Sequence, residues 1–207
     1  MAIRDIYEAV LAFDVNGVRR KINAELNAGS AADAILKTGL IAAMDEVGKR
    51  FSTGALFIPD MIWAAKAMQT GVEALKPFLT EGLIQSAGTV VIGTVHGDLH
   101  DIGKNLVKLM LEGARFNVID LGVDITAERF AASAKENAAD LVAMSALLTT
   151  TMPCMQQTVS AIRNMGLKAK TIVGGAPVTQ TFADEIQADG YAEDATSAVE
   201  LVRRLMK

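Results

Sequence analysis

The sequence predicts an α/β protein in two parts, an N-terminal four-helix bundle (residues 1–85) and a C-terminal flavodoxin-like, Rossmann-type domain (residues 88–207). Apolar residues recur at helical spacing through the first 80 or so residues. After Gly88, short β-branched runs alternate with helical stretches, which predicts βα units and a five-stranded parallel sheet. A chain of 207 residues is long enough for each part to bury a core.

The four helices of the first part are defined by their apolar stripes and by the residues at their ends. The stripes run over Ile3–Phe13, Val18–Leu26, Ile35–Phe51 and Ile58–Leu75. Gly29 ends the second helix, Ser30 is placed to cap the third, and Pro59 suits the first turn of the fourth. Four short helices joined by short loops predict an antiparallel bundle. Residues 81–87 are the predicted linker.

The second part has the residue pattern of a parallel sheet covered on both faces. The predicted strands are residues 89–95, 117–121, 140–144, 170–173 and 189–191. The predicted helices are residues 103–114, 126–137, 153–165, 178–187 and 194–206. The strands are short, apolar and mostly β-branched, which is typical of strands buried on both faces. The flavodoxin-like strand order 2-1-3-4-5 is expected.

Composition excludes several classes of protein. The chain has 20 Lys and Arg against 24 Asp and Glu, a formal net charge of −4, which argues against a nucleic-acid surface. It contains no apolar stretch of about 20 residues, so no membrane span is expected. The single cysteine, Cys154, excludes an intramolecular disulfide and suits a reducing compartment. With no secretory signal at the N-terminus, a cytoplasmic location is expected.

Three loops are expected to form the functional site. In an open parallel sheet, ligands bind at the carboxyl ends of the strands, near the switch point between strands 1 and 3. The loop after strand 1, residues 96–105, contains both histidines of the chain, His96 and His100. Residues 145–151 follow strand 3, and residues 174–177 follow strand 4. All three loops are rich in small or polar residues.

Asp98 and His100 form a possible metal-ligand pair in the first of these loops. A neutral imidazole is a good ligand for a transition metal, and it commonly donates its other ring N–H to a carboxylate. Gly103 would let the chain turn into the next helix and leave room for a bulky group. The alternative is a solvent-exposed histidine beside a carboxylate.

A zinc site and a phosphate-binding loop are two further alternatives in the same segment. Zinc would draw on His96, Asp98, His100 and Asp101, but a closed structural zinc site usually needs more cysteine than this chain has. Gly103-Lys104 lacks the spacing of a P-loop.

The loop as a whole resembles a known signature. GDLHDIGKN is similar to the Asp-x-His-x-x-Gly motif of cobalamin-binding domains, matched at Asp98, His100 and Gly103. The family's Ser-x-Leu element is matched by Ser145 and Leu147, and its paired glycine by Gly174-Gly175.

The resemblance extends over nearly the whole chain. Residues 44–68 are similar to the helical cap domain of methionine synthase and of corrinoid proteins in methyltransferase systems, and residues 190–195 look like the family's last loop. The layout resembles the free-standing corrinoid proteins of methylamine, methanol, betaine and aryl-ether systems.

The resemblance implies a role for each matched residue. His100 would be the lower axial ligand of cobalt in place of the cofactor's own benzimidazole, Asp98 its hydrogen-bond partner, and Thr151 the hydroxyl that extends the relay where methionine synthase has serine. The remaining cofactor-binding residues implied are Asp101, Ile102, Gly103, Ser145, Leu147, Thr149, Gly174, Gly175, Tyr191 and Ala192. Of these, Ser145, Thr149 and the glycine pair would line a slot for the displaced nucleotide tail, and Tyr191 and Ala192 would close its far end.

The helical part would cover the reactive face of the corrin. Phe57, Ile58 and Met61 are candidate contacts there, and the alternative for all three is the bundle core.

The function implied is that of a methyl carrier with a cobalamin or related corrinoid cofactor, cycling among methylcobalamin, Co(I) and Co(II) forms. A substrate-specific methyltransferase would place a methyl group on Co(I), and a second methyltransferase would pass it from methyl-Co(III) to tetrahydrofolate or a thiol. A reductive activase would complete the system, and the chain itself would have no catalytic residue.

Two alternatives share the same motif. A cobalamin-dependent sensor or regulator usually carries a further signalling or DNA-binding domain. The small subunit of an adenosylcobalamin mutase typically lacks the helical part.

Overall fold

The structure, a computed structural model, describes residues 2–79 and 86–206. It divides into two compact units, Met1–Gln85 and Ser86–Lys207. Residues 81–85 of the predicted linker lie outside the described residues. Ala87, at its end, is bound within the second unit, where its N–H donates to the Arg115 carbonyl at 3.0 Å. No helix among the described residues is both long and apolar enough to cross a membrane.

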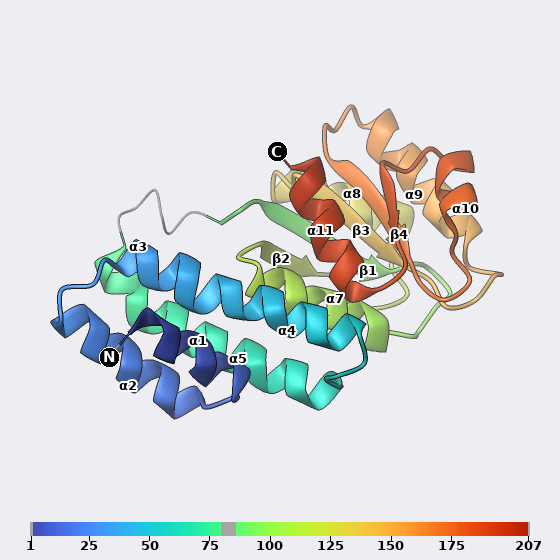
Figure 1. Ribbon diagram of the computed structural model, residues 1–207. Helices are drawn as coiled ribbons and strands as arrows, with labels where there is room; N and C mark the ends of the chain where they lie inside the picture. The colour runs from blue at the N-terminus through green and yellow to red at the C-terminus, as the bar shows by residue number, and fades with distance from the viewer. Residues whose placement is uncertain (1, 80–85, 207) are drawn as a thin grey trace. The chain divides into compact units, whose positions relative to one another are not determined.

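The first unit is helical, as predicted (Figure 1). Its elements are α1 (Ile3–Leu11), α2 (Val15–Asn27), α3 (Ala32–Ala34), the π-helical η1 (Ile35–Ile41), α4 (Ala42–Ser52), α5 (Ile58–Leu75) and the 3₁₀ turn η2 (Lys76–Phe78). Because α3, η1 and α4 follow one another without a break, they form the single third helix that the sequence predicts. The π-helical stretch in its middle has no counterpart in the sequence pattern.

Apolar side chains from all four helical runs meet in the interior of this unit. Ile6, Ile22 and Leu40 are fully buried there. Gly71 of α5 marks a close approach, because a Cβ atom at this position would lie 2.7 Å from Leu40 Cδ1 and 3.1 Å from Ile22 Cδ1. The absence of a side chain at Gly71 therefore lets α5 pack tightly on η1 and α2.

The capping prediction for Ser30 is wrong. Ala31 occupies the N-cap position of the third helical run, and Ser30 Oγ instead donates to Glu25 Oε2 at 2.7 Å. Glu25 is a buried carboxylate, so the hydroxyl of Ser30 serves it rather than the helix end. Pro59 does lie in the first turn of α5, as predicted.

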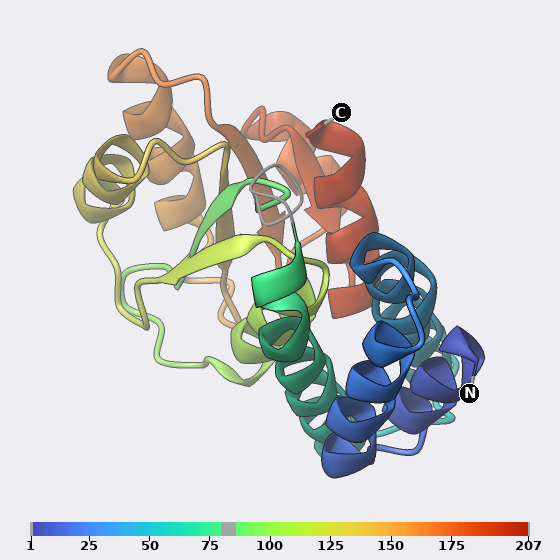
Figure 2. The ribbon, with the colours of Figure 1, turned by 90° about the vertical axis from the view of Figure 1, so that its left-hand side faces the viewer.

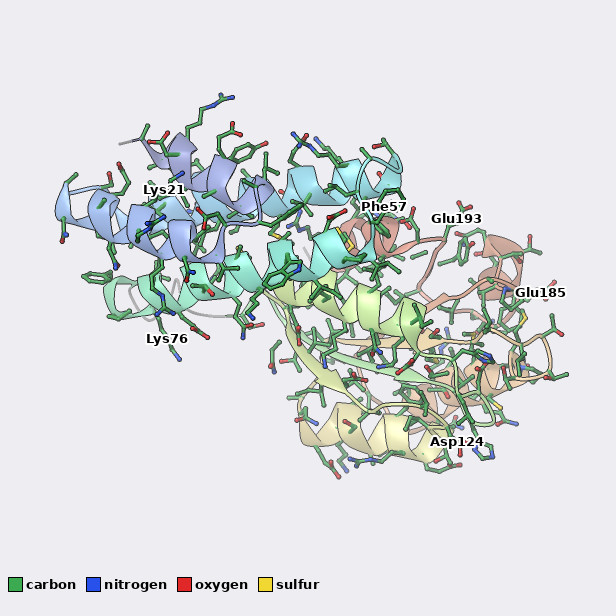
Figure 3. All side chains as sticks on the ribbon, turned by 90° about the horizontal axis from the view of Figure 1, so that it is seen from below. Lys21, Phe57, Lys76, Asp124, Glu185 and Glu193 are labelled. Carbon is green, nitrogen blue, oxygen red and sulfur yellow. The ribbon has the colours of Figure 1, made fainter. Side chains whose placement is uncertain are left out.

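Helix α5 also carries apolar residues on its outer side. Met61 is fully buried in the bundle core, which is the alternative that the sequence left open for it. Ile62 is exposed although it belongs to the apolar stripe of this helix. Ile58 and Phe57, which is labelled in Figure 3, are exposed too, so the bundle core is not their place. The apolar residues of α5 spread over more of its circumference than one buried face can cover.

The second unit is the predicted flavodoxin-like domain. Its elements are β1 (Thr89–Thr94), α7 (Ile102–Gly113), β2 (Asn117–Asp120), α8 (Ala127–Glu136), β3 (Leu141–Ser145), α9 (Pro153–Asn164), β4 (Lys170–Gly174), α10 (Gln180–Glu185), β5 (Gly190–Ala192) and α11 (Ala195–Leu205). The five strands are parallel, in the order β2-β1-β3-β4-β5, which confirms the predicted order. Figure 2 shows α8 and α9 on one face of the sheet and α7 and α11 on the other.

Alternation along β1 decides which side chains meet which helices. Val91 and Val95 belong to the core cluster that includes Phe130 of α8 and Met155 of α9. Gly93 also faces α8, since a Cβ atom there would lie 2.8 Å from Phe130 Cζ. Thr94 therefore points to the opposite face, the one that α7 covers.

A buried ion pair ties α7 to the end of β2. Lys104 Nζ lies 2.6 Å from Asp120 Oδ1, and the lysine side chain is almost completely buried. Burial alone would raise the pKa of Asp120, but hydrogen bonds from Lys104 and Gly122 and the charge of Lys104 hold that pKa below its usual range. A carboxyl group with a depressed pKa stabilises the folded state above its unfolded pKa of about 4, and this contribution is lost as the pH falls.

Asp120→Asn should lower the free energy of unfolding by about 3 kcal/mol, because it leaves the buried Lys104 ammonium without a carboxylate. Lys104→Met should cost less, because Asp120 keeps Lys108 Nζ at 3.3 Å and the Gly122 N–H at 2.9 Å. Urea unfolding of the two variants at pH 7 measures the difference. A larger loss for Lys104→Met than for Asp120→Asn would contradict this account.

Candidate functional site

The carboxyl ends of four strands align in one row. In the sheet register Thr94 pairs with Ser145, Ser145 with Gly174, and Gly174 with Ala192. Three predicted site residues from distant parts of the sequence thus become neighbours across β3, β4 and β5. Ser145 lies at the end of β3 rather than in the loop after it, and it is half-buried.

The carboxylate of Asp98 is the centre of the site. Within the described residues, it accepts hydrogen bonds from His100 N at 3.1 Å, His100 Nδ1 at 2.7 Å, Leu147 N at 2.8 Å, Leu148 N at 3.2 Å and Thr151 Oγ1 at 2.9 Å. The Asp98 side chain is 0% exposed. The predicted Thr151–Asp98–His100 geometry is therefore present, and the bonds from Leu147 and Leu148 join the loop after β3 to the loop after β1.

These bonds keep the Asp98 carboxyl group ionised. Burial alone would raise the pKa of Asp98, but the hydrogen bonds from His100, Leu147 and Thr151 outweigh burial and hold that pKa well below its usual range. An ionised carboxylate only accepts hydrogen bonds, so Nδ1 of His100 carries the proton. In the neutral form of the ring, Nε2 then carries the lone pair that can bind a metal. No described residue hydrogen-bonds to Nε2, and the His100 side chain is 52% exposed.

The residues that follow His100 open helix α7. Asp101 is its N-cap residue and accepts a hydrogen bond from Asn105 Nδ2 at 2.9 Å. Gly103 lies in the first turn with an ordinary helical backbone, so the predicted need for glycine at a turn is wrong. A Cβ atom at Gly103 would meet nothing within 4 Å, so the backbone and its neighbours leave open space there.

Large apolar side chains on the His100 loop, and on the loop that binds Asp98, are exposed. Leu99 and Ile102 are 70% and 73% exposed, and Leu147 and Leu148 are also exposed. Exposed apolar side chains gathered on one surface usually mark a binding site. The predicted site residue Thr149, on the same loop as the two leucines, is exposed as well.

The paired glycine has a structural reason of its own. Gly175 has φ +124°, and a Cβ atom there would lie 2.0 Å from the Ala146 carbonyl oxygen. A Cβ atom at Gly174 would lie 2.9 Å from the Ala192 carbonyl oxygen. The end of β4 and the loop after it therefore pack directly on neighbouring backbone. This packing requires glycine at both positions with or without a ligand.

Tyr191 is half-buried against the core of the unit. Burial, together with the charges of Glu193 and Asp194, raises the pKa of its hydroxyl. Ala192, beside it, is buried.

The second histidine has a carboxylate partner as well. His96 Nδ1 lies 2.7 Å from Asp124 Oδ1, and both side chains are largely exposed. Asp124, labelled in Figure 3, precedes α8. The Gly97 N–H donates to the Asp124 carboxylate at 2.7 Å. No group of three or more metal-ligating side chains occurs in the described part of the chain, so a zinc centre built from His96, Asp98, His100 and Asp101 has no support.

Sequence reasoning missed three contributors to this site. Thr94 Oγ1 donates to the His100 carbonyl at 3.0 Å, the Leu148 N–H donates to Asp98, and Lys104 anchors the helix that follows His100. A threonine at the end of a predicted apolar strand was the only signal for Thr94. A backbone donor such as Leu148 leaves no sequence signal.

Comparison with known proteins agrees with this geometry. Residues 88–200 and residues 2–76 match two protein-family models, each described as a B12 binding domain. The chain is therefore a cobalamin-binding protein, and each of its two units matches a family model of its own.

The relatives place the chain more narrowly. It is 46% identical over 175 residues to dimethylamine corrinoid protein 1 of Methanosarcina acetivorans (83% of this chain, 82% of the relative). It is 42% identical over 203 residues to trimethylamine corrinoid protein 1 of the same organism (96% of this chain, 94% of the relative). The chain belongs to the family of cobalamin-binding corrinoid proteins.

Solved structures show the same fold. A cobalamin-binding protein from Desulfitobacterium hafniense matches with a TM-score of 0.83 and 31% identity over 99% of this chain and 98% of that one. A chain of the methanol:cobalamin methyltransferase complex MtaBC from Methanosarcina barkeri matches with a TM-score of 0.85 and 29% identity over 99% of this chain and 79% of that one.

The cofactor of the chain is therefore cobalamin or a related corrinoid, and the residues present fit it. One imidazole nitrogen is free, its partner carboxylate is ionised and buried, and Gly103 leaves space beside it. The exposed leucines and Ile102 offer an apolar surface of the kind that a flat macrocycle covers.

Gly175→Ala should destabilise the protein without cofactor by at least about 2 kcal/mol, because alanine is strained at this φ and its Cβ meets the Ala146 backbone. Gly103→Ala is the matched control, and it should be neutral or stabilising by about 0.5–1 kcal/mol, because alanine favours a helix over glycine. Urea unfolding measures both. If the two variants were equally stable, the packing reason for Gly175 would be refuted.

Proposed function

We propose that this chain is a non-catalytic corrinoid methyl carrier. One substrate-specific methyltransferase loads a methyl group from a donor, and a second methyltransferase passes it to tetrahydrofolate or a thiol. A reductive activase restores the cofactor after oxidation. Bound cobalamin supplies the chemistry, a cobalt atom that accepts and releases methyl groups, while the protein binds and orients it.

The observation that carries this proposal is the Thr151–Asp98–His100 relay. Asp98 holds the imidazole in the tautomer whose Nε2 would be the protein's ligand to cobalt. Thr151 donates to the same carboxylate, which keeps it charged in a buried position. A carboxylate behind a ligating histidine raises its basicity, so this relay strengthens the ligand.

The remaining site residues are proposed to hold the rest of the cofactor. Asp101, Ile102 and Leu147 would bind the cofactor beside His100. Ser145, Thr149, Gly174 and Gly175 line the slot for the nucleotide tail, and Tyr191 and Ala192 close it. The register that aligns Ser145, Gly174 and Ala192 on neighbouring strands supports one continuous slot.

Two other cobalamin functions fit less well. A mutase small subunit typically lacks the helical unit, whereas residues 2–76 of this chain match a B12 binding domain of their own. A sensor fits less well because trimethylamine corrinoid protein 1, a relative named as a corrinoid protein, aligns over 94% of its length with 96% of this chain.

His100→Ala should remove the nitrogen ligand from cobalt, because Nε2 of His100 is the proposed donor. The protein is loaded with methylcobalamin, and its absorption spectrum is compared with that of the wild type. His96→Ala is the matched control, since His96 lies on the same loop and also pairs with an aspartate at 2.7 Å. The proposal expects a ligand-off spectrum for His100→Ala alone. A ligand-on spectrum in His100→Ala, or loss of that spectrum in His96→Ala alone, would contradict the assignment of His100 as the cobalt ligand.

Methyl transfer itself tests the carrier function. The cobalamin-loaded, reduced protein is mixed with methyltransferases for methylamines or methanol, each with its donor, and the cofactor spectrum and donor consumption are followed. One pair should react, and Thr151→Val should slow that reaction about 10-fold, because it weakens the support of the ligand. Failure of every pair, while a methylamine corrinoid protein reacts under the same conditions, would refute a carrier of this class.

A further inference from the structure

The backbone of His100 is anchored at both of its polar groups by side chains. Its N–H donates to Asp98 Oδ1 at 3.1 Å, and its carbonyl accepts a hydrogen bond from Thr94 Oγ1 at 3.0 Å. Asp98 and Thr94 approach from different places, the loop itself and the end of β1. Together they fix the peptide planes on either side of the His100 Cα atom.

Thr94 is buried at the carboxyl end of a strand that has a neighbouring strand on each side. Its side chain is fully buried. Strand β1 lies between β2 and β3, and Thr94 N donates to the Gly122 carbonyl at 3.0 Å, while Ile125 N donates to the Thr94 carbonyl at 3.0 Å. The hydroxyl is therefore a fixed donor, aimed at the loop from the face of the sheet that α7 covers.

The Asp98 carboxylate and the Thr94 hydroxyl restrain different motions. Asp98 sets the tautomer and rotation of the imidazole ring through Nδ1. Thr94 holds the peptide group that leads from His100 into α7. It therefore sets the position of the His100 Cα atom relative to the end of β1. A ligand nitrogen at the far end of the ring is displaced by any shift of that Cα atom, even with the Asp98 bond intact.

We propose that Thr94 is a positioning residue for the cobalt ligand, acting through the backbone carbonyl of His100. This inference rests on the proposed role of His100. Removal of the Thr94 hydroxyl lets the His100 peptide relax and favours the form in which the imidazole has left cobalt. Thr94 does not touch the cofactor in this account.

The test compares three threonine variants loaded with methylcobalamin. Thr94→Val removes the hydroxyl at nearly constant volume, and Thr94→Ser restores it. Thr158→Val is the matched control, because Thr158 is also fully buried and its hydroxyl also donates to a backbone carbonyl, that of Cys154 at 2.9 Å, inside α9. The ligand-on fraction is measured from absorption spectra across pH, and the nitrogen splitting is read from the electron paramagnetic resonance of the Co(II) form.

Thr94→Val should shift the ligation equilibrium about three- to tenfold toward the ligand-off form, the effect of losing one hydrogen bond. Thr94→Ser should return it to the wild-type value. Thr158→Val should lower stability to urea about as much as Thr94→Val does, but it should leave ligation unchanged.

Three other results would each contradict a different part of this proposal. Wild-type ligation in Thr94→Val, together with loss of the nitrogen splitting in His100→Ala, would overturn the Thr94 inference and leave the His100 assignment standing. Persistence of the nitrogen splitting in His100→Ala would overturn both. An equal shift in Thr158→Val would mean that general loosening, rather than Thr94, controls the ligand.

Discussion

The site depends on keeping one buried carboxylate, that of Asp98, ionised. Taking a charge of this kind out of water costs several kcal/mol unless hydrogen bonds replace the lost solvent. Donors from His100, Leu147, Leu148 and Thr151 replace it here. The same bonds set the imidazole tautomer and join the loop after β1 to the loop after β3. One set of hydrogen bonds therefore both stabilises the buried charge and orients the imidazole.

The parallel sheet supplies the geometry that this arrangement needs. Leu147 lies 49 residues from Asp98 in the chain, yet β1 and β3 are neighbours whose carboxyl ends meet at one edge. Lys104 and Asp120 hold the following helix to β2, and Gly175 lets the loop after β4 lie against Ala146. The site is therefore supported by the strand order of the fold as well as by the residues of its motif.

Much of this architecture could be predicted from local patterns, and the errors have physical causes. Helical and strand periodicities report burial of one face or two, which is why the helical first unit and the parallel sheet were predicted correctly. The strand order followed from the topology that is typical of five βα units. Ser30 was misassigned because a buried glutamate competes for its hydroxyl. Ile62 was misassigned because periodicity does not say which of two apolar faces a helix buries. The π-helical stretch and the backbone donors to Asp98 leave no residue signature.

The sequence by itself identified the residues of the candidate site, because Asp98, His100 and Gly103 match the Asp-x-His-x-x-Gly motif, although their spacing alone left an exposed histidine beside a carboxylate as an alternative. It gave no sign that His96 also has an aspartate partner. In both histidine–aspartate pairs, His96 with Asp124 and His100 with Asp98, Nδ1 lies 2.7 Å from Oδ1, but only Asp98 is buried. Tertiary structure alone decided that difference, because the donors that keep Asp98 ionised include residues about fifty positions away, which reach it only when β1 and β3 pair.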